Sequence, residues 1–117
     1  MINVPISIGD FVDKISILII KSEKVQNENK AKNINKELDL LLSMSNFINH
    51  KDIEDLKKIN LRLWDCENNI RNNPTLKTAI EIAKYNDIRA KLKQEINRKY
   101  SSNLTEEKEY ESSNNRT

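Results

Sequence analysis

The sequence predicts an all-α fold, an irregular antiparallel bundle of about four helices arranged as two helical hairpins. The 117 residues include one Gly and two Pro, which leaves few positions for tight turns. Apolar residues recur at spacings of three and four over long segments, which is typical of amphipathic helices. Residues that cap helices stand where these segments begin, and the short connections between segments favour antiparallel neighbours.

The first helix is expected to begin after Ser7, because Ser7 and Asp10 have the spacing of a capping box. The run from 15 to 20 is apolar enough for a buried strand. The cap and the helical period continue through it, so a helix is favoured. Apolar side chains fall on two faces of this helix, which predicts that it is central or lies at a subunit interface.

Three further helices are predicted, over about 30–44, about 52–72 with Asp52 as N-cap, and from Thr75 to about Tyr100. The last two are expected to pack through apolar seams. These seams consist of Leu56, Ile59, Leu63, Cys66 and Ile70 in the third helix and Leu76, Ala79, Ile80, Ala83, Ile88, Leu92 and Ile96 in the fourth.

Residues 1–104 are expected to form a single helical domain, and residues 105–117 an acidic polar tail that is partly docked or disordered. The first segment has 18 basic and 14 acidic residues, a charge of +4, and the tail has two basic and four acidic residues. A charge of +4 is too low to predict the clustered basic face of a nucleic-acid-binding protein.

Several classes of protein and site are not favoured by the composition. No apolar stretch is long enough to span a membrane, and the start lacks a signal-peptide pattern. Cys66 is the single Cys and cannot form an internal disulfide, so a cytoplasmic location is expected. Cys66 falls on a seam with no dedicated base, which argues against a nucleophile. No cofactor is predicted.

A metal site is not predicted either. His50 is the single His, and its one neighbouring carboxylate leaves too few ligands for a metal ion. Acidic pairs occur at Asp10 with Asp13 and at Asp52 with Asp55, an arrangement that helical pyrophosphohydrolases use to hold magnesium. The Glu-rich pairing expected of that enzyme class is absent.

Polar residues that interrupt the apolar pattern mark the candidate site. They share helix faces next to the apolar seams, so the three faces can meet. The candidates are Asp13, Lys21, Trp64, Glu67, Arg71, Asn86, Arg89 and Lys93. Three interpretations stay open: a solvated surface, a buried ionic network that fixes helix register, or a ligand site. For Trp64, a core position is favoured over a wall for a sugar or base.

Four blocks of the chain resemble, in order, the motifs of a small all-helical bacterial and phage domain family of unknown function. They are the opening 6–21, with Ser-Ile-Gly-Asp and Asp-Lys-Ile, the Trp-Asp-x-Glu-x-x-Ile-Arg block at 64–71, the block 86–97, and Glu-Glu-Lys-x-Tyr at 106–110. The resemblance covers residues 4–110. It implies no established activity, a loose association with glycosyltransferase and surface-polysaccharide functions, and a polar network or site at the eight candidate residues. It also implies that Leu104 and Tyr110 fold back onto the bundle.

Two functions are compatible with these observations. The favoured one is a non-enzymatic accessory or interaction module, linked to surface-glycan biosynthesis and forming a homo-oligomer through the first helix. The alternative is a binding protein or enzyme for an anionic small molecule, such as a sugar phosphate or nucleotide-sugar. In the alternative, the cations meet the negative charge, Trp64 gives a flat wall, and Glu67 is the candidate base if there is catalysis.

Overall fold

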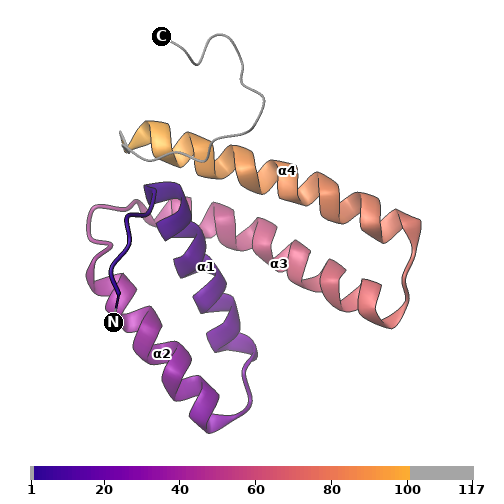
Figure 1. Ribbon diagram of the computed structural model, residues 1–117, viewed down its shortest axis with the longest axis horizontal. Helices are drawn as coiled ribbons and strands as arrows, with labels where there is room; N and C mark the ends of the chain where they lie inside the picture. Colours follow the sequence, from indigo (N-terminus) through magenta and orange to yellow (C-terminus); the bar gives the residue numbers. More distant parts are fainter. Residues whose placement is uncertain (1, 101–117) are drawn as a thin grey trace.

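The computed structural model describes residues 2–100, and these form four helices. They are α1 (Ile8–Lys24), α2 (Glu28–Ser43), α3 (His50–Asn72) and α4 (Leu76–Lys99). Within 2–100 there is no strand, and residues 15–20 are helical. The α1–α2 hairpin packs against the α3–α4 hairpin (Figure 1). The predicted all-α bundle of two hairpins is therefore confirmed.

Each helix begins at a polar cap whose side chain accepts a hydrogen bond from a backbone N–H of the first turn. The caps are Ser7 for α1, Asn27 for α2, Asn49 for α3 and Thr75 for α4. The predictions for Ser7 and Thr75 are confirmed. The prediction for Asp52 is wrong: Asn49 caps α3, and Asp52 lies inside the first turn, with its carboxylate bound to the end of α4.

The central element is α1, which packs against all three other helices. Val12 and Ile15 are fully buried, and Ile20 is buried on another side of the same helix. The core around Val12 and Ile15 is completed by residues of the other helices, namely Leu38, Ile53, Leu56, Ile59 and Ile96. Residues of both apolar faces of α1 are thus buried within the chain, while Ile17 between them stays half-buried. The central position, one of the two alternatives drawn from its two-sided pattern, is confirmed, and a subunit interface stays a prediction.

Gly9 sets how closely α1 approaches α4. Its backbone N–H donates to the Asn97 Oδ1 atom at 2.7 Å, and Asn97 is 2% exposed. A Cβ atom at position 9 would lie 2.5 Å from the backbone carbonyl oxygen of Lys93. Backbone cannot move aside as a flexible side chain does, so the absence of a side chain at Gly9 allows this contact.

A second contact joins the ends of the α3–α4 hairpin. The Tyr100 hydroxyl donates to the Asp52 carboxylate and accepts from the Asn49 N–H at 2.8 Å, and Lys99 Nζ lies 3.0 Å from Asp52 Oδ2. Burial opposes the charge of Asp52, but the hydrogen bonds from Tyr100 and Lys99 outweigh it and hold the pKa of this carboxyl below its ordinary value. The contact therefore stabilises the fold above the unfolded-state pKa and is lost as the pH falls through the folded-state pKa.

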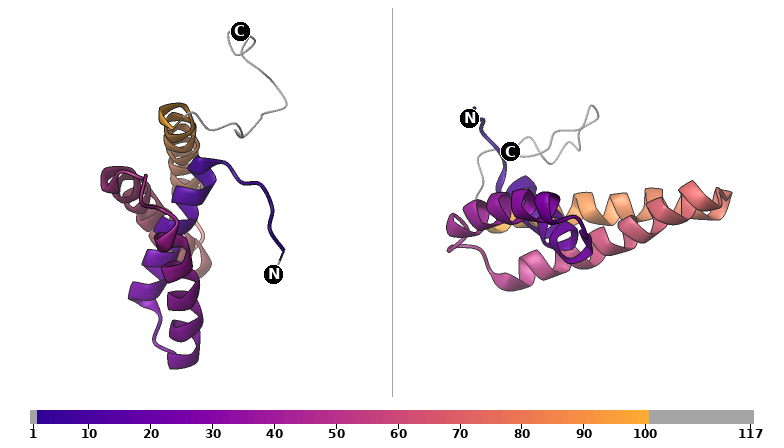
Figure 2. Two further views of the ribbon diagram at one scale, coloured as in Figure 1. Left: turned by 90° about the vertical axis from the view of Figure 1, so that its left-hand side faces the viewer. Right: turned by 90° about the horizontal axis from the view of Figure 1, so that it is seen from below.

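The other end of the α3–α4 hairpin projects beyond α1 and α2 (Figures 1 and 2). We call this part, from Glu67 in α3 to Tyr85 in α4, the arm. The arm has no buried residue, and the buried residues of α4, Ile96 and Asn97, lie at the opposite end of that helix. The arm is thus a pair of helices with little core of its own.

The predicted seam of α4 is wrong in its first half. Leu76 is 77% and Ile80 60% exposed, and Ala79 and Ala83 are exposed with them. These four residues form an apolar stripe on the outer side of α4, opposite the side of Tyr85, Leu92 and Ile96 that packs into the core. The apolar spacing of α4 is compatible with two rotations of this helix about its axis. In the rotation observed, Arg89 points inward, as described below. The seam of α3 is as predicted from Leu56 to Cys66.

The predicted acidic tail, 105–117, and the docking of Leu104 and Tyr110 lie outside the described residues. Within 2–100, no helix combines the length and apolar character that crossing a membrane requires.

The contact at Gly9 predicts the effect of Gly9→Ala. In most helices Ala stabilises by about 1 kcal/mol relative to Gly. Here the clash with the Lys93 carbonyl should reverse the sign and lower the free energy of unfolding by about 2 kcal/mol. Urea denaturation followed by helical circular dichroism measures the change. Asn33→Ala, on the exposed surface of α2, is the control and should be neutral or slightly stabilising. A Gly9→Ala protein as stable as the parent would show that the two helices can move apart.

Candidate functional site

A two-point ion pair joins α1 to α4. Arg89 Nε donates to Asp13 Oδ1 at 3.0 Å, and Arg89 Nη2 donates to Asp13 Oδ2 at 2.5 Å. The Asp13 side chain is 7% exposed and that of Arg89 is 30% exposed. A buried carboxylate requires a charged, hydrogen-bonding partner, and the flat fork of a guanidinium supplies both.

The network extends to α3 through Asn60. Its Nδ2 atom donates to Asp13 Oδ1 at 2.9 Å and to Ser16 Oγ at 2.8 Å, while Ser16 Oγ donates to the Asp13 carbonyl at 2.7 Å. Among residues 2–100, no buried side-chain nitrogen or oxygen lacks a hydrogen-bond partner. Three helices are therefore joined by one fully satisfied polar cluster, which favours a buried network for Asp13 and Arg89 over a solvated surface.

A pocket of about 330 Å³ opens beside this network, where α1, α3 and the start of the arm meet. We call it the notch. Its apolar lining comes from Ile17, Ile20, Leu63 and Trp64, and its polar lining from Asn60, Glu67, Asn68, Arg71, Asn86 and Arg89. Five of the eight candidates predicted from the sequence therefore line one pocket: Trp64, Glu67, Arg71, Asn86 and Arg89.

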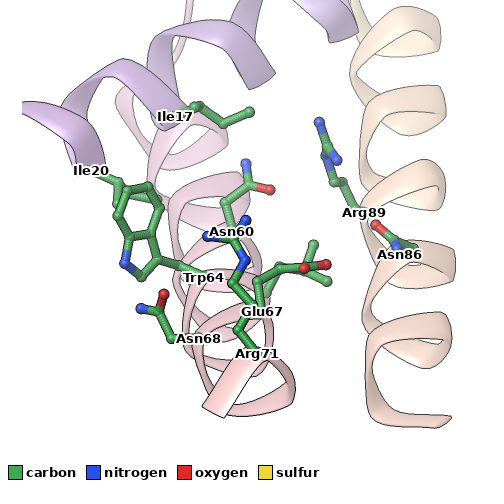
Figure 3. Close-up of a pocket in the computed structure, with 10 residues that line it drawn as sticks. Ile17, Ile20, Asn60, Trp64, Glu67, Asn68, Arg71, Asn86 and Arg89 are labelled. Carbon is green, nitrogen blue, oxygen red and sulfur yellow. The ribbon is translucent and has the colours of Figure 1, made fainter. Parts of the chain in front are cut away.

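The side chains of the notch approach it from different directions (Figure 3). Arg71 runs back along α3 toward Asn60, as long side chains on helices do. Glu67 points across the notch toward α4, which contributes Asn86 and Arg89. Among residues 2–100, Arg71 forms no ion pair. Its guanidinium is thus a cation that the described fold does not neutralise.

Trp64 differs from the expectation of a core residue. It is half-buried and lines the notch, with its ring beside Ile20 (Figure 3). Lys24 Nζ lies 5.9 Å from the ring centroid, within cation–π range. The reason is geometric: α1 ends beside Trp64, and the arm continues past it, so no further helix covers the ring. The indole forms a wall of the pocket.

The remaining candidates line a second pocket, of about 370 Å³, between α2 and α4 over α1. We call it the lysine cleft, and it is lined by Asp10, Asp13, Lys14, Ile17, Leu18, Lys21, Glu37, Arg89 and Lys93. Lys93 pairs here with Asp10, and its Nζ atom lies 2.9 Å from Asp10 Oδ1. Burial opposes the charge of Asp10, but hydrogen bonding and charge attraction from Lys93 outweigh it and lower the pKa of Asp10.

Cys66 and His50, which the sequence did not favour as site residues, lie outside both pockets. Cys66 is buried, and burial followed by the charges of nearby acids raises the pKa of its thiol, which makes it a poor nucleophile. His50 is exposed and lies 3.6 Å from Glu54 at the start of α3. Among residues 2–100, no group of three or more His, Cys, Asp or Glu side chains could hold a metal ion.

Sequence reasoning missed several members of the site. Asn60 is not among the eight candidates, although it lies one helical turn before Trp64 on the same face and joins Asp13 to Ser16. Ser16 could have been found, because it is a polar residue within the most apolar run of the chain. Asn68 gave no signal, since it falls one residue past Glu67 in a polar stretch.

A comparison with known protein families, curated proteins and solved structures finds no match to this chain. The resemblance to a small helical family therefore stays a prediction from sequence motifs. The geometry of the two pockets is the basis for a functional proposal.

The ion pair predicts a sharp difference between two substitutions in one pocket. Arg89→Met leaves Asp13 buried without its cation and should lower the free energy of unfolding by about 3 kcal/mol. Glu67→Gln removes an exposed charge from the same notch and should change it by no more than about 0.5 kcal/mol. Chemical denaturation of both variants tests this. Equal stability of Arg89→Met and the parent would contradict the structural role of the pair.

Proposed function

We propose that this protein is a non-enzymatic binding module for an anionic, hydroxyl-rich small molecule, of the class of sugar phosphates and nucleotide-sugars. The observation that carries the proposal is the notch. There an indole wall and three carboxamides surround one pocket together with Glu67 and Arg71, and Arg71 forms no ion pair among residues 2–100. Its volume of about 330 Å³ lies within the range of small-molecule sites, about 300–1,000 Å³.

The apolar side of the notch suits the face of a sugar or base ring. Trp64 presents a flat aromatic surface, and Ile17 and Ile20 continue the apolar wall. A ring placed against this wall buries its C–H face and leaves its polar substituents toward the opposite side. An aromatic ring at a pocket wall therefore supports a flat or cyclic ligand over an extended, flexible one.

The polar side suits hydroxyl groups. Carboxamides such as Asn68 and Asn86 both donate and accept hydrogen bonds, as hydroxyls do. Glu67 accepts from hydroxyls. It is exposed, and we assign it to binding and not to proton transfer, because catalysis by one carboxylate would require a second acid or base positioned in the notch.

The cations of the notch favour a negatively charged ligand. Asp13 binds two nitrogens of Arg89, which reduces the attraction of that guanidinium for a ligand. Arg71 has no such partner among residues 2–100 and reaches into the notch from the side of the arm. A guanidinium recognises phosphate and carboxylate through paired hydrogen bonds. The position of Arg71 in the notch therefore supports an anionic ligand.

The notch contains the only Trp of the chain, so intrinsic fluorescence reports on the site directly. We expect saturable fluorescence changes and calorimetric heats with sugar phosphates, and weaker binding of the matching neutral sugars. Arg71→Gln should weaken phosphate-ligand binding about tenfold, the effect of one charge-assisted hydrogen bond. Arg98→Gln, an exposed charge outside both pockets, is the matched control.

The outcome that contradicts this proposal is equally direct. If a panel of sugar phosphates and nucleotide-sugars gives no saturable signal by calorimetry with the folded parent protein, the notch is not a site for this class. Binding that Arg71→Gln leaves unchanged would place the ligand elsewhere on the protein.

The cellular setting we propose is the cytoplasm, near surface-glycan biosynthesis. The motif resemblance points to that setting, and the ligand class is one that such a process consumes. The single buried Cys66 is compatible with a reducing compartment.

A second candidate function is self-association, the interaction role favoured from the sequence. Val12, Ile15 and Ile20 of α1 are buried within the chain, which leaves the first helix less apolar surface for a partner than its sequence predicts. The exposed apolar stripe of Leu76, Ala79, Ile80 and Ala83 on α4 is the observation that favours another copy as partner. Sedimentation equilibrium tests it. We expect a mass that rises with concentration and returns to the monomer in Ile80→Lys, and a constant monomer mass would contradict it.

A further inference from the structure

We infer that the notch and the lysine cleft are two parts of one binding groove, and that the ligand carries a phosphate chain that extends from one into the other. The inference rests on the proposed function and specifies its ligand: a sugar or nucleoside with a diphosphate group is preferred over the corresponding monophosphate.

The two pockets meet at shared residues. Ile17 of α1 and Arg89 of α4 line both the notch and the lysine cleft. The Asp13–Arg89 ion pair lies at the same boundary, because Asp13 lines the cleft and Arg89 lines both pockets. A ligand that leaves the notch over Ile17 therefore enters the cleft without crossing another helix.

The charges of the cleft are arranged in pairs, with one exception. Lys14 lies 3.3 Å from Glu37, Lys93 lies 2.9 Å from Asp10, and Arg89 binds Asp13. Lys21 is exposed and forms no ion pair among residues 2–100. It is the cation that leaves the cleft with a net charge of +1, from four basic and three acidic lining residues.

Lys21 in the lysine cleft and Arg71 in the notch thus share one property. Each is a cation without an acidic partner among the described residues, and they line different pockets that meet at Ile17 and Arg89. A compact monophosphate in the notch satisfies Arg71 and leaves Lys21 in water. A longer anionic chain over Ile17 brings a second phosphate to Lys21, where an ammonium is well suited to meet it.

The volumes support the same conclusion. The notch, at about 330 Å³, and the cleft, at about 370 Å³, each lie at the lower end of the range for small-molecule sites. Together they match a two-part ligand, with a ring against Trp64 and a charged chain toward Lys21. The linings of the two pockets also differ as such a ligand requires. The aromatic ring is in the notch, and the lysine in excess over the acidic residues is in the cleft.

The test measures how much the second phosphate adds to affinity. Calorimetry compares a monophosphate and a diphosphate of the same sugar or nucleoside, each with the parent protein and with Lys21→Gln. In the parent, the diphosphate should bind about tenfold more tightly. In Lys21→Gln that gain should fall to less than about twofold, while the monophosphate affinity stays unchanged. Lys32→Gln, an exposed α2 charge outside both pockets, should retain the full gain.

The outcomes separate this inference from the proposed function. If the monophosphate binds in the notch and depends on Arg71, but Lys21→Gln leaves the diphosphate gain intact, the single-groove inference is overturned and the proposed function stands. If inorganic phosphate alone binds with a Lys21-dependent affinity and phosphorylated sugars bind no better, the cleft is a separate anion site. If none of these ligands binds, both proposals fail.

Discussion

A charged carboxylate in the core imposes the main constraint on this fold. Asp13 lies on the central helix and is almost fully buried, so its negative charge must be met by groups from the neighbouring helices. Arg89 supplies the charge from α4, and Asn60 supplies a further hydrogen bond from α3. An alternative packing that separates these helices leaves a buried charge without a partner. The apolar residues drive burial, and the ion pair selects one arrangement among those that bury them.

The same constraint accounts for the position of the candidate site. Arg89 on α4 faces α1. The same rotation of α4 places Arg89 and Asn86 at the notch, which Trp64 and Arg71 of α3 also line. The network satisfies Asp13 on one side and leaves a polar, partly open surface on the other. Structural and functional interpretations of these polar residues are therefore not exclusive. Asp13 and Arg89 hold the helices, while Arg71 and Lys21 remain unneutralised by the described residues beside them.

The sequence was sufficient to predict the helices, two of the caps and the seam of α3, because these depend on local spacing and on residues close in the chain. It was not sufficient to predict the rotation of α4. Leu76 and Ile80 have the period of a core face, yet they are exposed, since the pairing of Arg89 with Asp13 depends on residues 76 positions apart. The eight candidate residues were found as interruptions of the apolar pattern. Their division between two pockets required the crossing of the hairpins, which local patterns do not contain.

The projecting arm links the proposed binding to local stability, because part of the notch is built on it. Part of the notch, including Glu67, Arg71 and the approach to Asn86, is built on or next to helices that have no buried residue in this region. Such segments open locally at lower free energy than a core does. The affinity for the proposed ligand is then the intrinsic affinity scaled by the fraction of molecules in which this part of the arm is folded. For the proposed ligand, helix-stabilising substitutions near the α3–α4 turn should therefore tighten binding without contacting it.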